Sequence, residues 1–324
     1  MSKDNDIRRY LAVIRKSVAL IEGLLENDGG LTEQLAGQPV VAPQPVVQQP
    51  VVDTAEEDRK KKEFLAARKK HIDSLMGIDC WPEAVAPHLI TNPSKLDQSN
   101  RAKAVLDMMV DRPLEGQKFL DYGCGEGWIA YQAIQRGVGE STGFDIQKNE
   151  VWAGLTGPTY TSDYALLKEG HYDIVMLYDV LDHCHDPIDL MAKVKRVLRP
   201  DGTVYVRCHP WTSKHATHIY KQGLNKSYLH LFLNQGEIDE LLGDKGTQVF
   251  TRPEKKPLDA YRYWFSQFNV KKERLVEEQV SEFFHVPAFK ELLANENQIP
   301  HEEIDDFLRR MKIQFVDYVL TPKR

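Results

Sequence analysis

The middle of the chain alternates short apolar runs with segments whose apolar residues recur at helical spacing, which predicts a parallel sheet covered by helices. The clearest run is 172–178, where isoleucine, valine, methionine and leucine follow one another. Residues 311–320 alternate between apolar and polar types and predict the final strand. Further strands are expected at 118–122, 140–144, 158–161, 203–208 and 247–251, with helices at 128–136, 188–198 and 236–242, the last beside the fifth strand.

The N-terminal region has a different pattern. Ile7, Ile14 and Ile21 are seven residues apart, which predicts an amphipathic helix within residues 1–30 that needs a partner surface. Pro-Val-Val recurs three times in residues 31–54, which predicts a semi-rigid linker. This spacing favours a helix that oligomerises or tethers the chain, although docking on its own domain stays open.

The remaining residues, 55–324, are expected to form one domain. Residues 55–76 and 94–110 predict two helices within a cap, 55–117, over the ligand site. The basic side chains of the first helix are interpreted as a solvated face. Residues 254–310 are expected to be a long, mostly helical insertion, whose aromatic run at 261–265 is interpreted as core packing.

Composition narrows the class of protein. The net charge of −6 carries no signature of a nucleic-acid-binding protein. No apolar run reaches membrane-spanning length, and the polar first residues do not match a secretory signal. The four cysteines form no C-x-x-C motif, so we expect reduced thiols and a cytoplasmic location.

Three glycines follow the strand at 118–122 in a tight loop that leads into a helix. Gly123, Gly125 and Gly127 alternate with other residues behind Asp121. Glycine permits positive φ angles and lets a ligand approach the backbone, while a helix N-terminus favours an anionic group. The loop therefore predicts a site for a small ligand with an anionic part.

The sequence Asp-x-Gly-x-Gly-x-Gly in this loop resembles motif I of the class I S-adenosylmethionine methyltransferases. Residues 179–187, Asp-Val-Leu-Asp-His-Cys-His-Asp-Pro, resemble the Glu-Val-Leu-Glu-His-x-x-Asp-Pro stretch of the members that act mostly on small molecules, with aspartates in place of the glutamates. The Leu-x-Pro-x-Gly turn at 198–202 also matches. The resemblance covers 118–208 and implies a seven-stranded, doubly wound, Rossmann-like sheet whose last strand inserts antiparallel between strands five and six.

An acid closing the second strand suits a ribose, because one carboxylate can accept hydrogen bonds from both hydroxyls. Asp145 is that acid, and Ile146 follows it in place to pack on a purine. The resemblance implies that Asp163 contacts the adenine amino group, with Tyr164 beside the ring. With S-adenosylmethionine as the cofactor, the expected cofactor-binding residues are Asp121, Gly123, Gly125, Gly127, Asp145, Ile146, Asp163 and Tyr164.

A catalytic base is expected near the ends of the fourth and fifth strands. His183 is the first candidate, because imidazole titrates near neutral pH, and His209 and Asp179 are the alternates. A structural role for His183 stays open. The histidine-rich segment 209–230 matches no familiar metal-ligand spacing, so no metal site is predicted. Its three lysines, Lys214, Lys221 and Lys226, favour an anionic acceptor.

We therefore predict an enzyme that methylates an O or N atom of a small molecule, saccharide or lipid head group. The segment after the fourth strand lacks the Asn/Asp-Pro-Pro-Tyr/Phe and Pro-Cys motifs of DNA-base methyltransferases. RNA or nucleotide methylation stays open but is not favoured. Two other hypotheses are a non-catalytic, tethering component of a larger assembly and a nicotinamide dehydrogenase. The spacing of the third glycine argues against the dehydrogenase.

Overall fold

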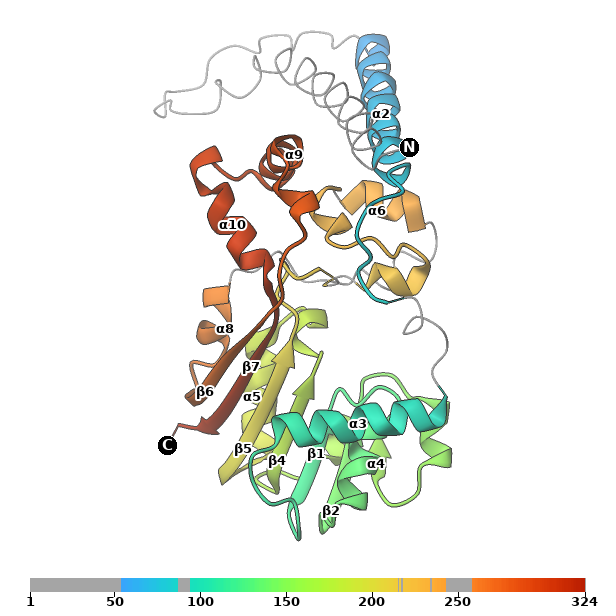
Figure 1. The fold of residues 1–324 in the computed structure, drawn as a ribbon. Helices are drawn as coiled ribbons and strands as arrows, with labels where there is room; N and C mark the ends of the chain where they lie inside the picture. The colour runs from blue at the N-terminus through green and yellow to red at the C-terminus, as the bar shows by residue number, and fades with distance from the viewer. Residues whose placement is uncertain are drawn as a thin grey trace, which may run out of the picture.

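The computed structural model places a mostly parallel sheet below a lobe of helices (Figure 1). It describes residues 54–86, 94–214, 216, 218–233, 235–242 and 258–323. The predicted N-terminal helix within 1–30, most of the predicted linker 31–54 and the predicted strand at 247–251 lie outside these residues. None of the helices in the described ranges is both long and apolar enough to cross a membrane.

The sheet has seven strands in the order β3-β2-β1-β4-β5-β7-β6. Strands β1 to β5 pair in parallel, and β7 runs antiparallel between β5 and β6. The doubly wound sheet and the position of its last strand, both predicted from the sequence, are confirmed. The strands are β1 Lys118–Tyr122, β2 Glu140–Phe144, β3 Thr159–Thr161, β4 Tyr172–Tyr178, β5 Leu198–Cys208, β6 Phe268–Glu277 and β7 Ile313–Pro322.

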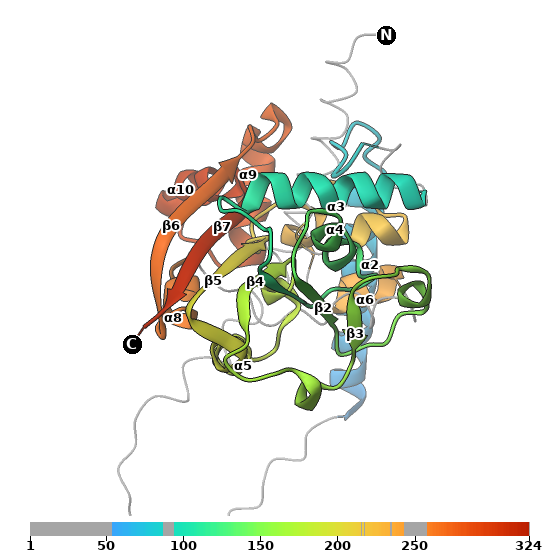
Figure 2. The same cartoon turned by 90° about the horizontal axis from the view of Figure 1, so that it is seen from below.

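Helices cover both faces of the sheet, which explains why its central strands are apolar throughout. The four side chains from Ile174 to Leu177 are fully buried. One face packs against α3 Lys95–Met109 and α4 Trp128–Gln135, and the other against α5 Pro187–Val197 and α8 Leu258–Trp264. Figure 2 shows α3 and α5 on opposite sides of the strands.

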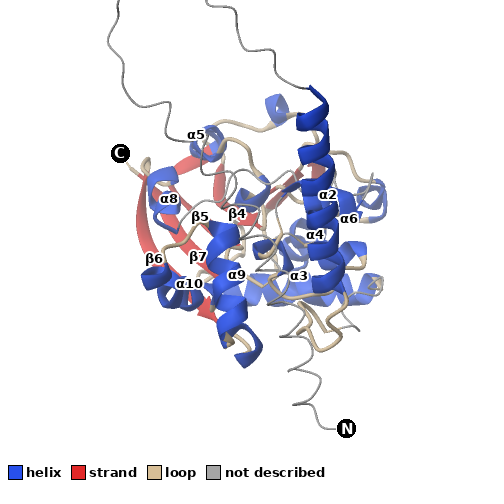
Figure 3. Ribbon diagram, turned by 90° about the horizontal axis from the view of Figure 1, so that it is seen from above, coloured by secondary structure: helices blue, strands red, loops and turns tan. Residues whose placement is uncertain are grey.

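A second core holds the helical lobe together. The helices of this lobe are α2 Thr54–Met76, α6 Gln235–Leu242, α9 Pro287–Asn297 and α10 Ile304–Met311. Trp81 lies at its centre, with its ring edge-on to Phe232 and Phe289. Figure 3, seen from the side of the lobe, shows α2, α9 and α10 in front of the strands. The parallel strands point toward this lobe, so their C-terminal ends face it (Figure 1).

Short 3₁₀ helices occur mainly in the connections between these elements, where single turns are common. They are η2 Glu150–Gly154, η3 Tyr164–Leu166, η4 Leu181–His183, η5 Ile219–Gln222, η6 Leu229–Leu231, η8 Glu282–His285 and η9 His301–Glu303.

One prediction about the C-terminal half was wrong, and another did not include a strand. The insertion 254–310 contains the strand β6, a charged edge strand whose residues 269–275 are exposed, so it lacks the apolar alternation that reveals a strand. The helix at 236–242 was expected beside the fifth strand, but Ile238 of α6 packs in the core of the helical lobe with Ile72 of α2. The two helices of the predicted cap lie in different parts of the molecule. Helix α3 lines the cavity described below, whereas α2 belongs to the helical lobe.

An ion-pair network fastens α2 to the lobe. The Nε atom of Arg68 lies 2.6 Å from a Glu237 carboxylate oxygen, and its Nη1 atom lies 3.3 Å from Glu296. Because the Glu237 side chain is only 4% exposed, an Arg68→Met variant leaves a buried carboxylate without its cation. We expect a loss of about 2 kcal/mol in the free energy of unfolding, below the full cost of breaking a wholly buried pair.

Urea denaturation measures this loss, and Arg59→Met is the matched control. Arg59 pairs with Glu63 on the exposed part of the same helix, so its removal is expected to change stability by about 0.5 kcal/mol or less. Equal effects of the two substitutions would contradict a stabilising role for the Arg68 network.

Candidate active site

The glycine loop at the end of β1 adopts the conformation expected from its sequence. Gly123, Gly125 and Gly127 have φ angles of 82°, 51° and 86°, in the left-handed region that favours glycine. The N–H groups of Gly123 and Cys124 donate to the carbonyl oxygen of Phe144 at 2.7 and 2.9 Å. The loop is therefore tied to the end of β2, and α4 begins directly behind it.

The three glycines are required for different reasons. A Cβ atom on Gly123 would lie 2.5 Å from the side chain of Val180, and one on Gly127 would lie 2.5 Å from the ring of Tyr160. A Cβ atom on Gly125 would meet no protein atom within 4 Å. Gly125 is thus the loop residue whose missing side chain leaves open space that a ligand can occupy.

Because of this difference, alanine substitutions at Gly127 and Gly125 are expected to destabilise the protein to different extents. Gly127→Ala is expected to lower the free energy of unfolding by about 3 kcal/mol, from its positive φ angle and the clash with Tyr160. Gly125→Ala has only the cost of its φ angle, about 1 kcal/mol, because its new methyl group enters open space. Urea denaturation separates the two, and equal destabilisation would contradict the assignment of the clash to Tyr160.

Two carboxylates flank the loop. Asp121 is buried and accepts a hydrogen bond from the N–H of Ala130, and burial raises its pKa to about 7. Asp145, at the end of β2, accepts hydrogen bonds from the N–H groups of Gly125 and Gln147 at 2.9 and 3.0 Å. The acid predicted to hold a ribose is therefore in direct contact with the loop.

The residues predicted to surround an adenine lie beyond the cavity described below. Ile146 is 82% exposed. Asp163 accepts a hydrogen bond from the N–H of Ala165 and begins η3. Tyr164 donates its hydroxyl proton to the carbonyl of Lys193, and its ring faces α5 rather than the loop. Their assignment to the cofactor stays a prediction.

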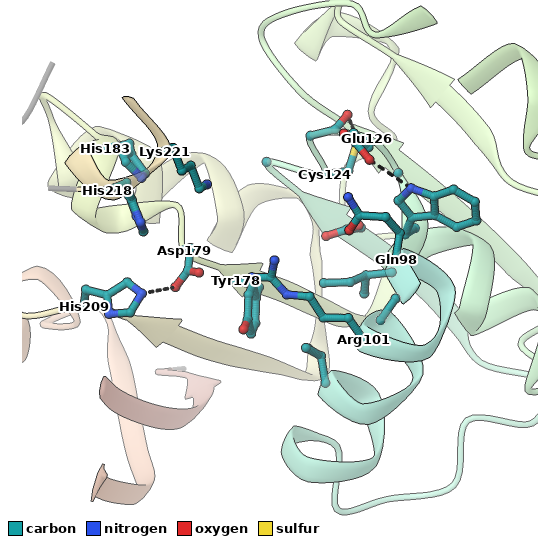
Figure 4. A pocket seen from close by; sticks show the side chains of 18 of the residues that line it. Gln98, Arg101, Cys124, Glu126, Tyr178, Asp179, His183, His209, His218 and Lys221 are labelled. Carbon is teal, nitrogen blue, oxygen red and sulfur yellow. Dashed lines mark hydrogen bonds and ion pairs between the residues drawn. The ribbon is translucent and has the colours of Figure 1, made fainter. Parts of the chain in front are cut away.

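A cavity of about 390 Å³ opens between the glycine loop and the helical lobe. In Figure 4 the loop and α3 form one wall, and a group of histidines with Asp179 and Lys221 forms the opposite wall. Tyr178 lies between the two walls. The lining includes Gln98, Arg101, Asp121, Gly123, Gly125, Gly127, Trp128, Tyr178, Asp179, His183, His209, His218, Tyr220, Lys221 and Phe315.

Asp179 and His209 form a pair on this wall. Asp179 follows β4 with a φ angle of 55°, a strained conformation for a residue with a side chain. Its carboxylate lies 3.6 Å from Nε2 of His209, which is 3% exposed. The Nδ1–H group of His209 donates to the carbonyl of Gln314 at 3.0 Å, so the lone pair of the neutral ring is on Nε2. Burial, assisted by the Asp182 carboxylate, raises the pKa of Asp179 to about 8.

A second group of titratable side chains adjoins this pair. The rings of His183 and His218 stack with centroids 5.1 Å apart, and both approach the buried carboxylate of Asp182 at 3.6 and 3.7 Å. Burial lowers the pKa of His218 to about 4, so the ring is neutral. Their donor atoms lie within 4.8 Å of one another and could hold a metal ion. The expectation that this wall has no metal stays a prediction.

The structure also separates the three lysines that were expected to bind an anion. Only Lys221 lines the cavity. Lys214 pairs with Glu278, and Lys226 donates to the carbonyl of Ile78 and lies over the ring of Trp81.

Sequence reasoning missed several residues of the cavity. Arg101 extends from α3 toward Tyr178, with its guanidinium 6.0 Å from the centre of that ring. Phe315 comes from the start of β7 and contacts His209, with ring centroids 4.4 Å apart. His218 lies in the histidine-rich segment 209–230 but was not among the candidate catalytic residues. Of these residues, only Arg101 could have been recognised from the sequence, as an arginine on the helix that precedes the first strand.

Several known proteins are similar to this chain. The model of a family described as methyltransferase domain matches residues 95–295. Among curated proteins, the ubiquinone biosynthesis O-methyltransferase of Thiobacillus denitrificans is 30% identical over 105 residues, 29% of this chain and 44% of that protein. The protein of the same name from Roseobacter denitrificans is 28% identical over 141 residues, 39% of this chain and 57% of its own length. The chain thus spans about half the length of these relatives.

Among solved structures, a SAM-dependent methyltransferase from Archaeoglobus fulgidus is 14% identical to the chain. Its match covers 72% of this chain and 99% of that protein, with a TM-score of 0.45.

Proposed function

The chain belongs to the methyltransferase domain family, and we propose that it transfers a methyl group from S-adenosylmethionine to an oxygen or nitrogen atom of a polar, anionic small molecule. The observation that carries this proposal is the cavity whose one wall is the glycine loop and whose opposite wall is the Asp179–His209 pair. A donor held at the first wall faces a proton-accepting group at the second.

The residues at the loop fit the cofactor. Gly125 leaves open space, and Asp145 beside it supplies carboxylate oxygens for a ribose diol. Asp121 would orient the methionine end through its ammonium group, and Arg101 from α3 is suited to its carboxylate. Asp163, Tyr164 and Ile146 are proposed for the adenine, outside the cavity.

When bound, S-adenosylmethionine supplies a methyl group activated by its sulfonium, so the protein mainly orients the reactants and removes a proton. We assign that proton transfer to the Asp179–His209 pair. The Nε2 lone pair of His209 faces Asp179, and the Gln314 carbonyl fixes the tautomer. His183 is the second candidate, because its side chain is 38% exposed and lines the same cavity.

The charge of the cavity supports an anionic acceptor. Arg101 and Lys221 both line it, and the Asp179 carboxylate acts electrostatically on each of them. One cation would serve the donor and the other would serve a carboxylate or phosphate on the acceptor. The relatives named as O-methyltransferases favour oxygen as the methylated atom. A saccharide or a lipid head group would also meet these requirements.

The direct test incubates the protein with S-adenosylmethionine and a panel of hydroxylated carboxylates, sugars, phospholipid head groups and short RNAs. The readout is formation of S-adenosylhomocysteine together with a mass increase of the acceptor. Turnover on a small anionic hydroxyl compound is expected. Saturable binding of the cofactor without turnover on any acceptor would instead support the tethering hypothesis. If only RNA is methylated, the proposal of a small-molecule acceptor is wrong and RNA is the acceptor.

We also propose that residues 1–30 mediate self-association or attachment to an assembly, through the apolar stripe of Ile7, Ile14 and Ile21. Deletion of residues 1–52 is expected to lower the oligomer mass measured by light scattering while affinity for S-adenosylmethionine is retained. An unchanged mass would contradict the self-association.

A further inference from the structure

Two aromatic side chains hold the glycine loop from outside the cavity. The indole N–H of Trp152 donates to the carbonyl of Gly125 at 2.8 Å, and the hydroxyl of Tyr160 donates to the carbonyl of Gly127 at 2.9 Å. The two rings stack on each other, with centroids 5.3 Å apart and planes at 13°. Trp152, from η2, and Tyr160, from β3, therefore act as one unit, here called the aromatic clamp.

The clamp helps to set the direction of two peptide groups in the loop, and the Gly127 carbonyl also accepts a hydrogen bond from the N–H of Tyr131 in α4 at 3.0 Å. In a planar trans peptide the C=O and the N–H point in opposite directions. With the carbonyls of Gly125 and Gly127 bound to the clamp, the N–H groups of Glu126 and Trp128 point away from it. Both residues line the cavity. In the described part of the chain, neither N–H has a hydrogen-bond acceptor.

The clamp also restricts the loop sterically. The ring of Tyr160 occupies the space that a Cβ atom on Gly127 would need, and it fills the corresponding space at Gly143 of β2. A loop with three glycines has many accessible conformations when free, and ordering it upon binding costs affinity. A loop fixed in advance avoids that cost.

We propose that Trp152 and Tyr160 are positioning residues for the methyl donor, holding the amides of Glu126 and Trp128 toward the anionic end of S-adenosylmethionine. This proposal rests on the proposed function, because it requires that cofactor at the loop. Neither clamp residue lines the cavity, so we expect its effect on cofactor affinity and not on the chemical step.

The test uses conservative variants in the full-length chain. Trp152→Phe and Tyr160→Phe each remove one hydrogen bond to the loop and keep an aromatic ring. Calorimetric titration is expected to show affinities for S-adenosylmethionine and S-adenosylhomocysteine that are each about five- to tenfold weaker. The kcat at saturating S-adenosylmethionine is expected to stay within about twofold of the wild-type value, since the reacting groups are unchanged.

Two residues elsewhere provide matched controls. The indole of Trp81 donates to the carbonyl of Ser227 at the same distance of 2.8 Å, inside the helical lobe. The hydroxyl of Tyr172 donates to Thr142 within the sheet. Trp81→Phe and Tyr172→Phe also remove one hydrogen bond each and keep an aromatic ring, so they are expected to lower the thermal midpoint while cofactor affinity is retained.

Each outcome decides between the claims. Weaker binding in the clamp variants only, with all four variants folded at the temperature of the titration, supports the clamp. Clamp variants that bind as tightly as the wild type, or no more weakly than the controls, overturn it and leave the cofactor assignment standing. A wild-type protein that binds no S-adenosylmethionine overturns the proposed function as well.

Discussion

Methyl transfer is expected to slow by about 10²- to 10⁴-fold in the Asp179→Asn variant, the usual contribution of a positioned proton acceptor. Asparagine keeps the shape of the side chain beside His209 but cannot take up a proton at neutral pH. Cofactor affinity is expected to change little, because Asp179 lies on the wall opposite the glycine loop. The measurement is kcat and the dissociation constant for S-adenosylmethionine in the same preparation.

The pH dependence of the rate provides a second signature. With a pKa raised to about 8, the Asp179 carboxyl holds its proton below that pH and cannot accept another. The value of kcat/KM should therefore rise with pH to about 8 and then level off, and this rise should vanish in Asp179→Asn. The pair with His209 titrates as a unit, so the midpoint belongs to both groups.

The same pKa has a consequence for stability. The unfolded chain releases this proton near pH 4, whereas the folded protein keeps it until about pH 8. The contribution of Asp179 to stability is therefore complete below about pH 4 and is lost as the pH rises toward 8.

Asp173→Asn is the control for these experiments, because Asp173 lies at the other end of β4 and accepts a hydrogen bond from the N–H of Lys118. Its rate should match that of the wild type. If Asp179→Asn retains both the wild-type rate and the wild-type pH profile, His183 becomes the proton acceptor of choice.

The second large effect is expected at Asp145. In Asp145→Ala the affinity for S-adenosylmethionine should fall by about 10²- to 10⁴-fold, because two hydrogen bonds to a carboxylate are worth about 3–6 kcal/mol together. Part of the loss comes from the loop, since the N–H of Gly125 also loses its acceptor. Isothermal titration calorimetry on the two proteins measures the difference.

Asp145→Asn separates the two contributions. Its amide oxygen can still accept from Gly125, so a variant that binds better than Asp145→Ala identifies the part that the loop contributes. Asp201→Ala, at an exposed position of β5, is the control for the loss of a negative charge. An Asp145→Ala variant with wild-type affinity for S-adenosylmethionine would show that this carboxylate does not bind the cofactor.

The sheet could be predicted because its strands carry strong local signals. The central strand β4 is a run of apolar residues between turns, and the glycine loop after β1 marks where the chain reverses toward a helix. The edge strand β6 could not be found in this way. Its side chains are largely exposed and charged, so no buried face imposes a period of two on the sequence.

The site was predictable where one segment supplies both the pattern and the chemistry. The loop glycines and Asp145 follow strand ends directly, so their positions follow from the fold. Arg101, His218 and Phe315 reach the cavity from three separate elements, and only tertiary packing brings them together. The three lysines of segment 209–230 show the same limit of sequence-based prediction. They are close in sequence, but only the tertiary structure shows that Lys221 faces the cavity.

The placement of β7 has a consequence for how the protein becomes active during synthesis. Gln314 and Phe315 both contact His209, yet β7 follows every other described strand in the sequence. Ribosomes make the chain from its N-terminus, and domains start to fold as they emerge. Because a domain folds as a unit, we expect His209 to reach its final surroundings only after β7 has been made. Until β7 enters between β5 and β6, the proposed proton-accepting wall lacks the Gln314 carbonyl that fixes the His209 tautomer.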